Sequence, residues 1–389
     1  MRLVWAPSPL SSPSSKSCAV AALALLAALA PATVAAQSSD PAAQSAPLIE
    51  QRLKFPLRLA AGATRDVELD AMLVRPRGAG PFPLAVITHG TSREVELRQK
   101  VKPDWFVVEA RSLARRGWAA AIVVRHGFGA STGSFDEGFG TCDNPDFVHA
   151  GEVAAADLAG AVDYLREQPF VDRNRVLGIG QSTGGMAWLA AAARRVPGLV
   201  AVIAFAGGNG SAAPGVNCSE TRLVSTIEGF GAKTAVPTLW IFAENDHYFG
   251  PDLAKRMAAA WRDGGGQVEL HVVPPHGSDG HDLFLDAAAV QIWSPIVDPF
   301  LRAHRLPTWT VEQGMIDALQ GPHREHFQRY LTAASEKAFA IAEDGSWDWW
   351  VGARASTADA VRGAMEKCED GGKRKCRPFA VNFAKPAVP

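Results

Sequence analysis

The sequence has almost no excess of charge of either sign. It contains 39 lysine and arginine residues against 40 aspartate and glutamate residues, a formal net charge of −1. A partner such as nucleic acid or an acidic membrane surface is therefore not indicated. The apolar run near the N-terminus is shorter than the roughly 20 residues that cross a bilayer, and no period of about 20–50 residues indicates a repeat architecture. The length then favours one large domain and a smaller one.

The first 36 residues have the pattern of an export signal. Arg2 and Lys16 precede a short apolar stretch that ends in small residues. We expect cleavage near Ala36–Gln37, a flexible leader over residues 37–50, and a bacterial protein that is periplasmic or secreted. An uncleaved membrane anchor is the alternative. After cleavage, no stable membrane insertion is expected.

Cysteine is scarce, and the spacing of the five residues contains no C-x-x-C pair. Cys18 would leave with the signal, so four cysteines would remain. In an oxidising compartment an even number indicates disulfides rather than a metal site. Four cysteines allow three pairings, among which the sequence does not choose. We favour Cys142–Cys218 as a long-range tie and Cys368–Cys376 as a local clip.

Short apolar runs alternate with helical stretches over residues 51–305, which we expect to form a catalytic domain. The expected strands cover residues 67–74, 84–90, 118–127, 176–180, 199–208, 237–246 and 268–275. The expected helices cover residues 104–117, 151–168, 184–196, 250–265 and 293–304. This order predicts an α/β fold with a mostly parallel, doubly wound sheet flanked by helices. The strand at 67–74 alternates in polarity, which predicts an antiparallel edge. Residues 306–389 are expected to be a C-terminal extension with a small cysteine-clipped α+β module.

Ser182 lies in the pentapeptide Gly180-Gln181-Ser182-Thr183-Gly184, between an expected strand and an expected helix. This is the G-x-S-x-G pattern in the context that a nucleophilic serine requires. Glycines two positions before and after the serine relieve crowding at a strained turn. The following helix N-terminus favours negative charge. The alternative interpretation is a structural glycine-rich turn.

A serine nucleophile needs a base, and the base needs an orienting acid. The predicted acid is Asp246, which ends the expected strand at 237–246, the second strand after the one that precedes Ser182. Glu244 is the competing candidate, but it lies nearer the strand and so is less suited to the loop. The histidine belongs in the loop after the last strand. His281 precedes an apolar stretch there and is the predicted base, with His276 as the alternative base. His271 falls within the strand itself.

The loop after the expected strand at 268–275 does not have the pattern of a metal site. His276, Asp279, His281 and Asp282 offer ligands, but their spacing matches no familiar zinc site. We therefore expect no metal and no organic cofactor.

An oxyanion hole needs two backbone N–H groups aimed at the developing charge. Thr183, directly after the nucleophile, is the first predicted donor. Thr91 is the second predicted donor, because it follows Gly90, which lets the chain turn closely after the expected strand at 84–90. His89 is expected to brace this loop rather than to take part in the chemistry.

The segment RHGFGASTGSF, residues 125–135, follows the next strand and is rich in glycine and small polar residues. One interpretation places it at the mouth of the pocket, with Arg125 or His126 reaching bound substrate. The other is a structural loop.

Five blocks carry a resemblance to a known family: PFPLAVITHG, VVRHGFGASTG, VDRNRVLGIGQSTGG, IFAEND and DGHDLF. In this order, over residues 50–305, they resemble the dienelactone hydrolase branch of the α/β-hydrolases, which is similar to the catalytic domains of prolyl-oligopeptidase-type peptidases. The resemblance implies the α/β-hydrolase fold, a triad of Ser182, Asp246 and His281, and acyl transfer to water through an acyl-serine. Ala243 stands where these families often have glycine. Ser182 stands where true dienelactone hydrolases have cysteine, so that particular substrate is not implied.

These patterns together predict an exported serine hydrolase that acts on a small-molecule carboxylic ester. A serine exopeptidase or amidase with the same triad is the alternative enzyme. A third hypothesis is a non-catalytic binding protein on the same scaffold, with the tryptophan-rich C-terminal module as its working part. Covalent labelling of Ser182 by a fluorophosphonate separates the enzymes from the binding protein.

Overall fold

The computed structural model describes residues 46–57, 67–92 and 94–386. The predicted signal and residues 37–45 of the predicted leader lie outside the described residues. Strand β1, Ile49–Pro56, already begins within the last residues of the range expected for that leader. Among the described residues, no helix combines the length and the apolar character needed to cross a bilayer.

An eight-stranded sheet forms the centre of the fold, in the order β1-β2-β4-β3-β5-β6-β9-β10. Its strands are β1 (Ile49–Pro56), β2 (Glu68–Arg75), β3 (Phe82–Thr88), β4 (Ala119–Val123), β5 (Val171–Gln181), β6 (Leu199–Phe205), β9 (Thr238–Ala243) and β10 (Val268–Val273). Neighbours from β4 to β10 are parallel. Every residue of β4 and β9 is buried, as continuous apolar runs require when helices cover both faces of a sheet. The predicted parallel, doubly wound sheet is confirmed.

The prediction that the strand at 67–74 lies at the edge is wrong. That strand, β2, is antiparallel as expected, but it pairs with β1 on one side and with β4 on the other. The edge is β1, whose segment IEQRLKFP carries three charged residues and five exposed side chains. The charged residues of this segment do not indicate a strand; within the described residues, β1 pairs with β2.

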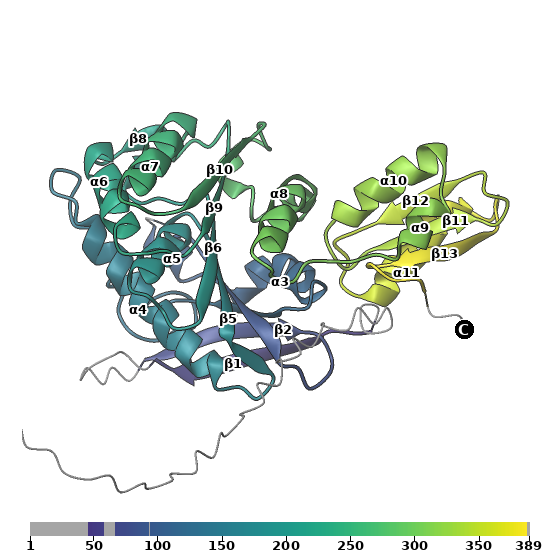
Figure 1. Ribbon diagram of the computed structural model, residues 1–389, viewed down its shortest axis with the longest axis horizontal. Helices are drawn as coiled ribbons and strands as arrows, with labels where there is room; N and C mark the ends of the chain where they lie inside the picture. Colours follow the sequence, from purple (N-terminus) through teal and green to yellow (C-terminus); the bar gives the residue numbers. More distant parts are fainter. Residues whose placement is uncertain (1–45, 58–66, 93, 387–389) are drawn as a thin grey trace, which may run out of the picture. The chain divides into compact units, whose positions relative to one another are not determined.

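Helices cover the two faces of the sheet (Figure 1). One face carries α4 (Phe147–Arg166), α5 (Thr183–Ala193), α6 (Glu220–Gly231) and α7 (Pro251–Asp263), and the other carries α3 (Val107–Ala114) and α8 (Val290–Ala303). The core between the sheet and the first group of helices, α4 to α7, contains the buried side chains of Trp188, Trp240 and Trp261. Helix α6 was not expected from the sequence. The shorter elements of this region are α2 (Val95–Arg98), η1 (Pro103–Phe106), β7 (Ser211–Ala213), β8 (Val216–Asn217), η2 (Gly280–Asp282) and η3 (Ala287–Ala289).

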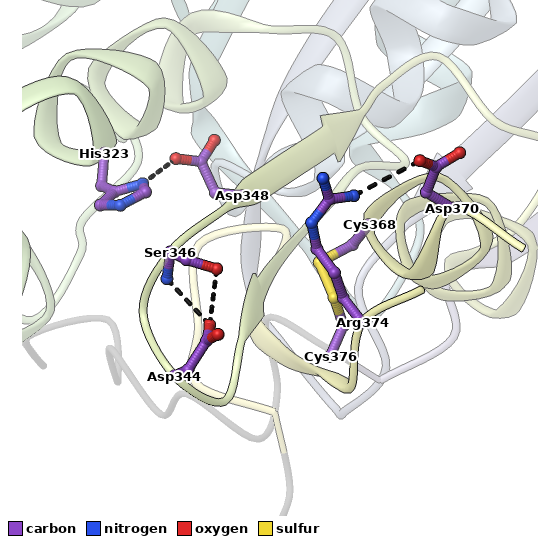
Figure 2. The surroundings of a disulfide bond; sticks show 8 residues. All are labelled: His323, Asp344, Ser346, Asp348, Cys368, Asp370, Arg374 and Cys376. Atoms are coloured by element: carbon purple, nitrogen blue, oxygen red, sulfur yellow. Dashed lines mark hydrogen bonds and ion pairs between the residues drawn. A yellow bond between two sulfur atoms is a disulfide. The ribbon is translucent and has the colours of Figure 1, made fainter. Parts of the chain in front are cut away.

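The C-terminal residues form a second, antiparallel sheet of three strands in the order β12-β11-β13. Its elements are α9 (Gln313–Asp317), α10 (Gly321–Thr332), β11 (Ala338–Ala342), β12 (Asp348–Val351), α11 (Thr357–Glu369) and β13 (Cys376–Val381). The disulfide Cys368–Cys376 joins the end of α11 to the start of β13. Figure 2 shows this clip and, nearby, His323 of α10 bonded to the buried carboxylate of Asp348.

A buried ion pair connects the extension to the end of α3. Arg115 donates two hydrogen bonds to Glu336, at 2.9 and 2.8 Å, and both side chains are almost fully buried. Trp118 donates to the carbonyl of Pro307 at 3.0 Å. Both sheets belong to one compact unit.

Candidate active site

Ser182 lies on a strained turn between β5 and α5. Its backbone has φ 56° and ψ −124°, a conformation that non-glycine residues rarely adopt. The turn is held because the Ser182 N–H donates to the carbonyl of Phe205 at 2.9 Å. The side chain keeps only a small exposed area, 8% for the residue. Strain of this kind concentrates at functional sites.

The glycines on either side of Ser182 are required by space, as predicted. A Cβ on Gly180 would lie 2.2 Å from the backbone of Gly184, and a Cβ on Gly184 would lie 2.4 Å from the carbonyl oxygen of His89. Both contacts are with backbone, which cannot move aside cheaply. The turn therefore packs directly against the loop after β3.

Asp246 and His281 form a hydrogen-bonded acid–base pair. Nδ1 of His281 lies 3.1 and 3.2 Å from the two carboxylate oxygens of Asp246. One of those oxygens also accepts from the backbone N–H groups of Tyr248 and Phe249, at 2.8 and 2.9 Å. With Nδ1 as the donor, Nε2 of the imidazole is left as an acceptor, the role that a general base needs.

The loop of His281 is anchored beside Ser182. The amide of Gln181, the residue before Ser182, donates to the carbonyl of His281 at 3.1 Å. The ring of Tyr248 lies 4.5 Å from the imidazole. Within the described part of the chain, Ser182 Oγ makes no hydrogen bond to His281. Hydrogen bonds between a serine nucleophile and its base commonly tighten only when substrate is bound.

The competing candidates have other partners. Nε2 of His276 pairs with Asp286 at 2.9 Å, and His271 pairs with Glu269 at 2.6 Å on β10. Glu244 is exposed. No group of three or more His, Cys, Asp or Glu side chains arranged to hold a metal ion occurs among the described residues. Of these acids and histidines, the structure brings together Asp246 and His281.

The two predicted oxyanion donors lie side by side. The hydroxyls of Thr91 and Thr183 are 2.7 Å apart. A Cβ on Gly90 would lie 2.6 Å from the amide oxygen of Gln181 and 2.9 Å from Cβ of Ser182. For neither threonine N–H does the described structure contain an acceptor. Two free N–H groups next to a serine are what a developing oxyanion requires.

Arg125 and His126 do not line the mouth of a pocket. Arg125 is fully buried and pairs with Glu137 at 2.5 Å. His126 is 3% exposed, and its Nδ1 lies 2.7 Å from Asp157. Burial acts to lower the pKa of His126, but hydrogen bonding and charge from Asp157 outweigh it, so the pKa is raised. The interpretation of this segment as a structural loop is the correct one.

A cleft of about 590 Å³ opens beside the acid loop. Its walls include Asp246, Tyr248, Asn217, Glu220 and Arg256, but neither Ser182 nor His281. The β7–β8 hairpin covers this loop: Gly215 donates to the carbonyl of His247 at 2.6 Å, and Asn217 donates to that of Tyr248 at 2.9 Å. The cleft thus adjoins Asp246, the predicted acid.

The disulfide Cys142–Cys218 lies next to that hairpin. It joins the segment before α4 to the start of α6, across 76 residues of sequence. Arg222 adds a hydrogen bond from α6 to Asn144 at 2.7 Å. Both predicted cysteine pairs are present in the structure.

Sequence reasoning missed three residues that shape the site. Gln181 contacts the backbone of His281, and Tyr248 contacts its ring. Glu137 contacts the guanidinium of Arg125. Gln181 and Tyr248 are neighbours of predicted catalytic residues, so proximity in sequence was the available signal. For Glu137 the signal was a carboxylate two residues beyond the glycine-rich segment that contains Arg125.

Part of the chain matches the model of a known protein family. Residues 65–248 match the model of the X-Pro dipeptidyl-peptidase (S15) family. The matched region contains Ser182 and Asp246 and ends before His281. A search of curated proteins gives no match.

Solved structures of three hydrolases are similar to part of the chain. A protein described as a dienelactone hydrolase, from Klebsiella pneumoniae subsp. pneumoniae MGH 78578, is 19% identical over 66% of this chain and 98% of its own, with a TM-score of 0.45. An acetyl xylan esterase from Paenibacillus sp. R4 is 17% identical over 66% and 89%, with a TM-score of 0.45. An acylaminoacyl peptidase from Pyrococcus horikoshii is 17% identical over 68% of this chain but only 43% of its own, with a TM-score of 0.48.

Proposed function

We propose that this chain is a hydrolase of the α/β-hydrolase superfamily and, more specifically, an exported serine hydrolase that cleaves small carboxylic esters through an acyl-serine intermediate. The observation that carries the proposal is the strained Ser182 with an Asp246–His281 pair at the same end of the parallel sheet. Serine, acid and histidine follow one another along the chain in the order typical of this fold.

The proposed reaction uses these residues in fixed roles. Ser182 Oγ attacks the acyl carbon while Nε2 of His281 takes its proton, and Asp246 stabilises the resulting imidazolium. The N–H groups of Thr91 and Thr183 donate to the oxyanion, each contributing about 3–4 kcal/mol of transition-state stabilisation. His281 then returns the proton to the leaving alcohol. A water molecule, deprotonated by His281, attacks the acyl-serine and releases the acid.

Ester hydrolysis is the activity that makes the fewest demands on this site. An alcohol leaves an ester more readily than an amine leaves an amide, because an alkoxide is the better leaving group and the amine depends more strongly on the proton from His281. A triad that cleaves amides therefore also cleaves activated esters, whereas the reverse does not follow.

Ser182→Ala is the direct test. We expect the variant to lose turnover of a p-nitrophenyl ester and labelling by a fluorophosphonate, while its melting temperature stays close to that of the wild-type protein. An active or labelled Ser182→Ala protein would contradict the assignment. A folded wild-type protein that neither labels nor turns over esters would instead favour the non-catalytic binding hypothesis.

A serine exopeptidase or amidase is the second candidate, because the matched family model describes X-Pro dipeptidyl-peptidases. A panel of p-nitrophenyl esters and X-Pro p-nitroanilides separates the two activities. If the protein is an esterase, its kcat/KM values for simple esters should vary with the acyl group of the ester. A clear preference for the X-Pro anilides would transfer the assignment to a peptidase.

Export and domain organisation are part of the proposal. Two disulfides support an oxidising compartment, since such bonds are rare in the cytosol. We propose a catalytic domain over residues 51–305, followed by an extension over residues 306–389. Mass spectrometry of the mature protein tests the cleavage expected near Ala36–Gln37.

A further inference from the structure

A buried guanidinium lies behind the two threonines of the site. Arg125 has no exposed surface, and its side chain forms a fork with the carboxylate of Glu137, at 2.5 and 3.0 Å. Glu137 is itself 5% exposed. A planar fork of this kind fixes the orientation of the guanidinium as well as its position.

The remaining donors of Arg125 reach both segments that would build an oxyanion hole. Nη1 donates to the carbonyl of His89 at 2.6 Å and to the hydroxyl of Thr88 at 2.9 Å, at the end of β3. Nη2 donates to the hydroxyls of Thr91 and Thr183, at 3.3 and 3.4 Å. One side chain thus spans the loop after β3 and the first residue of α5.

The neighbouring histidine completes this support in its neutral form. Burial and the charge of Arg125 hold the pKa of His89 well below its usual range. Its Nε2 accepts from the backbone N–H of Arg125 at 3.1 Å, so Nδ1 donates to the carbonyl of Gly90 at 2.7 Å. Arg125 and His89 therefore hold the backbone carbonyls of His89 and Gly90 in place.

We propose that Arg125, oriented by Glu137, is the positioning residue of the oxyanion hole. It acts through the side chains of Thr91 and Thr183, whose N–H groups would receive the oxyanion, and it does not touch the substrate. This inference rests on the proposed function. It assigns a role to the buried pair that simple stabilisation of the fold would not require.

Arg125→Lys is the test variant, since lysine keeps the charge but not the fork. A misplacement of about 1 Å at an active site costs up to about 10²-fold in rate. We expect kcat for a p-nitrophenyl ester to fall about 10–100-fold while KM changes little. Affinity for an alkylboronic acid, which forms a tetrahedral adduct on Ser182, should fall by the same factor as kcat/KM.

Arg116→Lys is the matched control. Arg116, two residues after the end of α3, makes a similarly buried fork to Asp298 of α8, at 2.8 and 2.9 Å. This variant should lose stability without changing kcat or boronic acid affinity per folded molecule. Equal kinetic effects in the Arg125 and Arg116 variants would overturn the positioning role.

Thr91→Val and Thr183→Val address the same point if Arg125→Lys does not fold. Each removes a hydroxyl that Arg125 holds but keeps the backbone N–H. We expect the kcat loss and the weaker boronic acid binding to appear together, and unchanged kinetics in both variants would overturn the inference. A wild-type protein without ester or amide turnover would reject the proposed function and this inference with it, whereas an active enzyme that is insensitive to these substitutions rejects the inference alone.

Discussion

Glu109→Gln is expected to remove a pH-dependent loss of stability. Glu109 lies on α3 and is 1% exposed, and neither carboxylate oxygen has a hydrogen-bond partner among the described residues. Burial raises the pKa of Glu109 from 4.5 to about 8, and the nearby charge of Asp286 adds to the increase. The carboxyl group is therefore protonated in the folded protein at neutral pH.

The sign and size of this pH effect on the free energy of unfolding follow from the number of protons bound by the folded and unfolded states. Between pH 4.5 and about 8, the folded protein keeps a proton on Glu109 that the unfolded chain has lost. The contribution to stability is thus fully present below pH 4.5 and is lost as the pH rises through the folded pKa. Each pH unit in this window costs about 1.4 kcal/mol, or about 5 kcal/mol in all. That is a large part of the about 5–15 kcal/mol by which domains are stable.

Urea unfolding of the wild-type and Glu109→Gln proteins, followed by tryptophan fluorescence, measures this effect. Glutamine is nearly isosteric and cannot ionise, so its advantage over glutamate should grow by about 3 kcal/mol from about pH 5 to pH 7. Glu228→Gln, at an exposed position of α6, is the control and should show no such trend. A constant difference between the wild-type and Glu109→Gln proteins over this range would refute the reasoning.

Three further expectations concern the triad and the nearby disulfide. Asp246→Asn should lower kcat by about 10⁴-fold, because the amide no longer fixes the tautomer of the imidazole; steady-state kinetics with a p-nitrophenyl ester measures it, and a loss below tenfold would argue against the acid role. His281→Ala should be inactive and His276→Ala fully active in the same assay, and the opposite result would transfer the base role. Replacing Cys142 and Cys218 together by serine should cost about 2–4 kcal/mol of stability. Chemical denaturation without reductant tests this, and an unchanged midpoint would contradict it.

The local parts of the site were predictable from neighbouring residues. The apolar run, Ser182 and the flanking glycines lie within one short segment, so the strand, the turn and the helix follow from local sterics. Strand β1 and helix α6 were not predicted. Strand β1 forms by pairing with β2, and its charged, mostly exposed sequence does not indicate that pairing.

The sequence by itself determined the fold class, the order of Ser182, Asp246 and His281 along the chain, and the candidates for each catalytic role. Those properties depend on residue type and on short spacings. Only the tertiary structure decided that Asp246 pairs with His281 while His276 pairs with Asp286, and that Arg125 is buried beneath Thr91 and Thr183. Hydrogen-bond partners and desolvation are set by segments distant in sequence that packing brings together, and no local pattern contains that information.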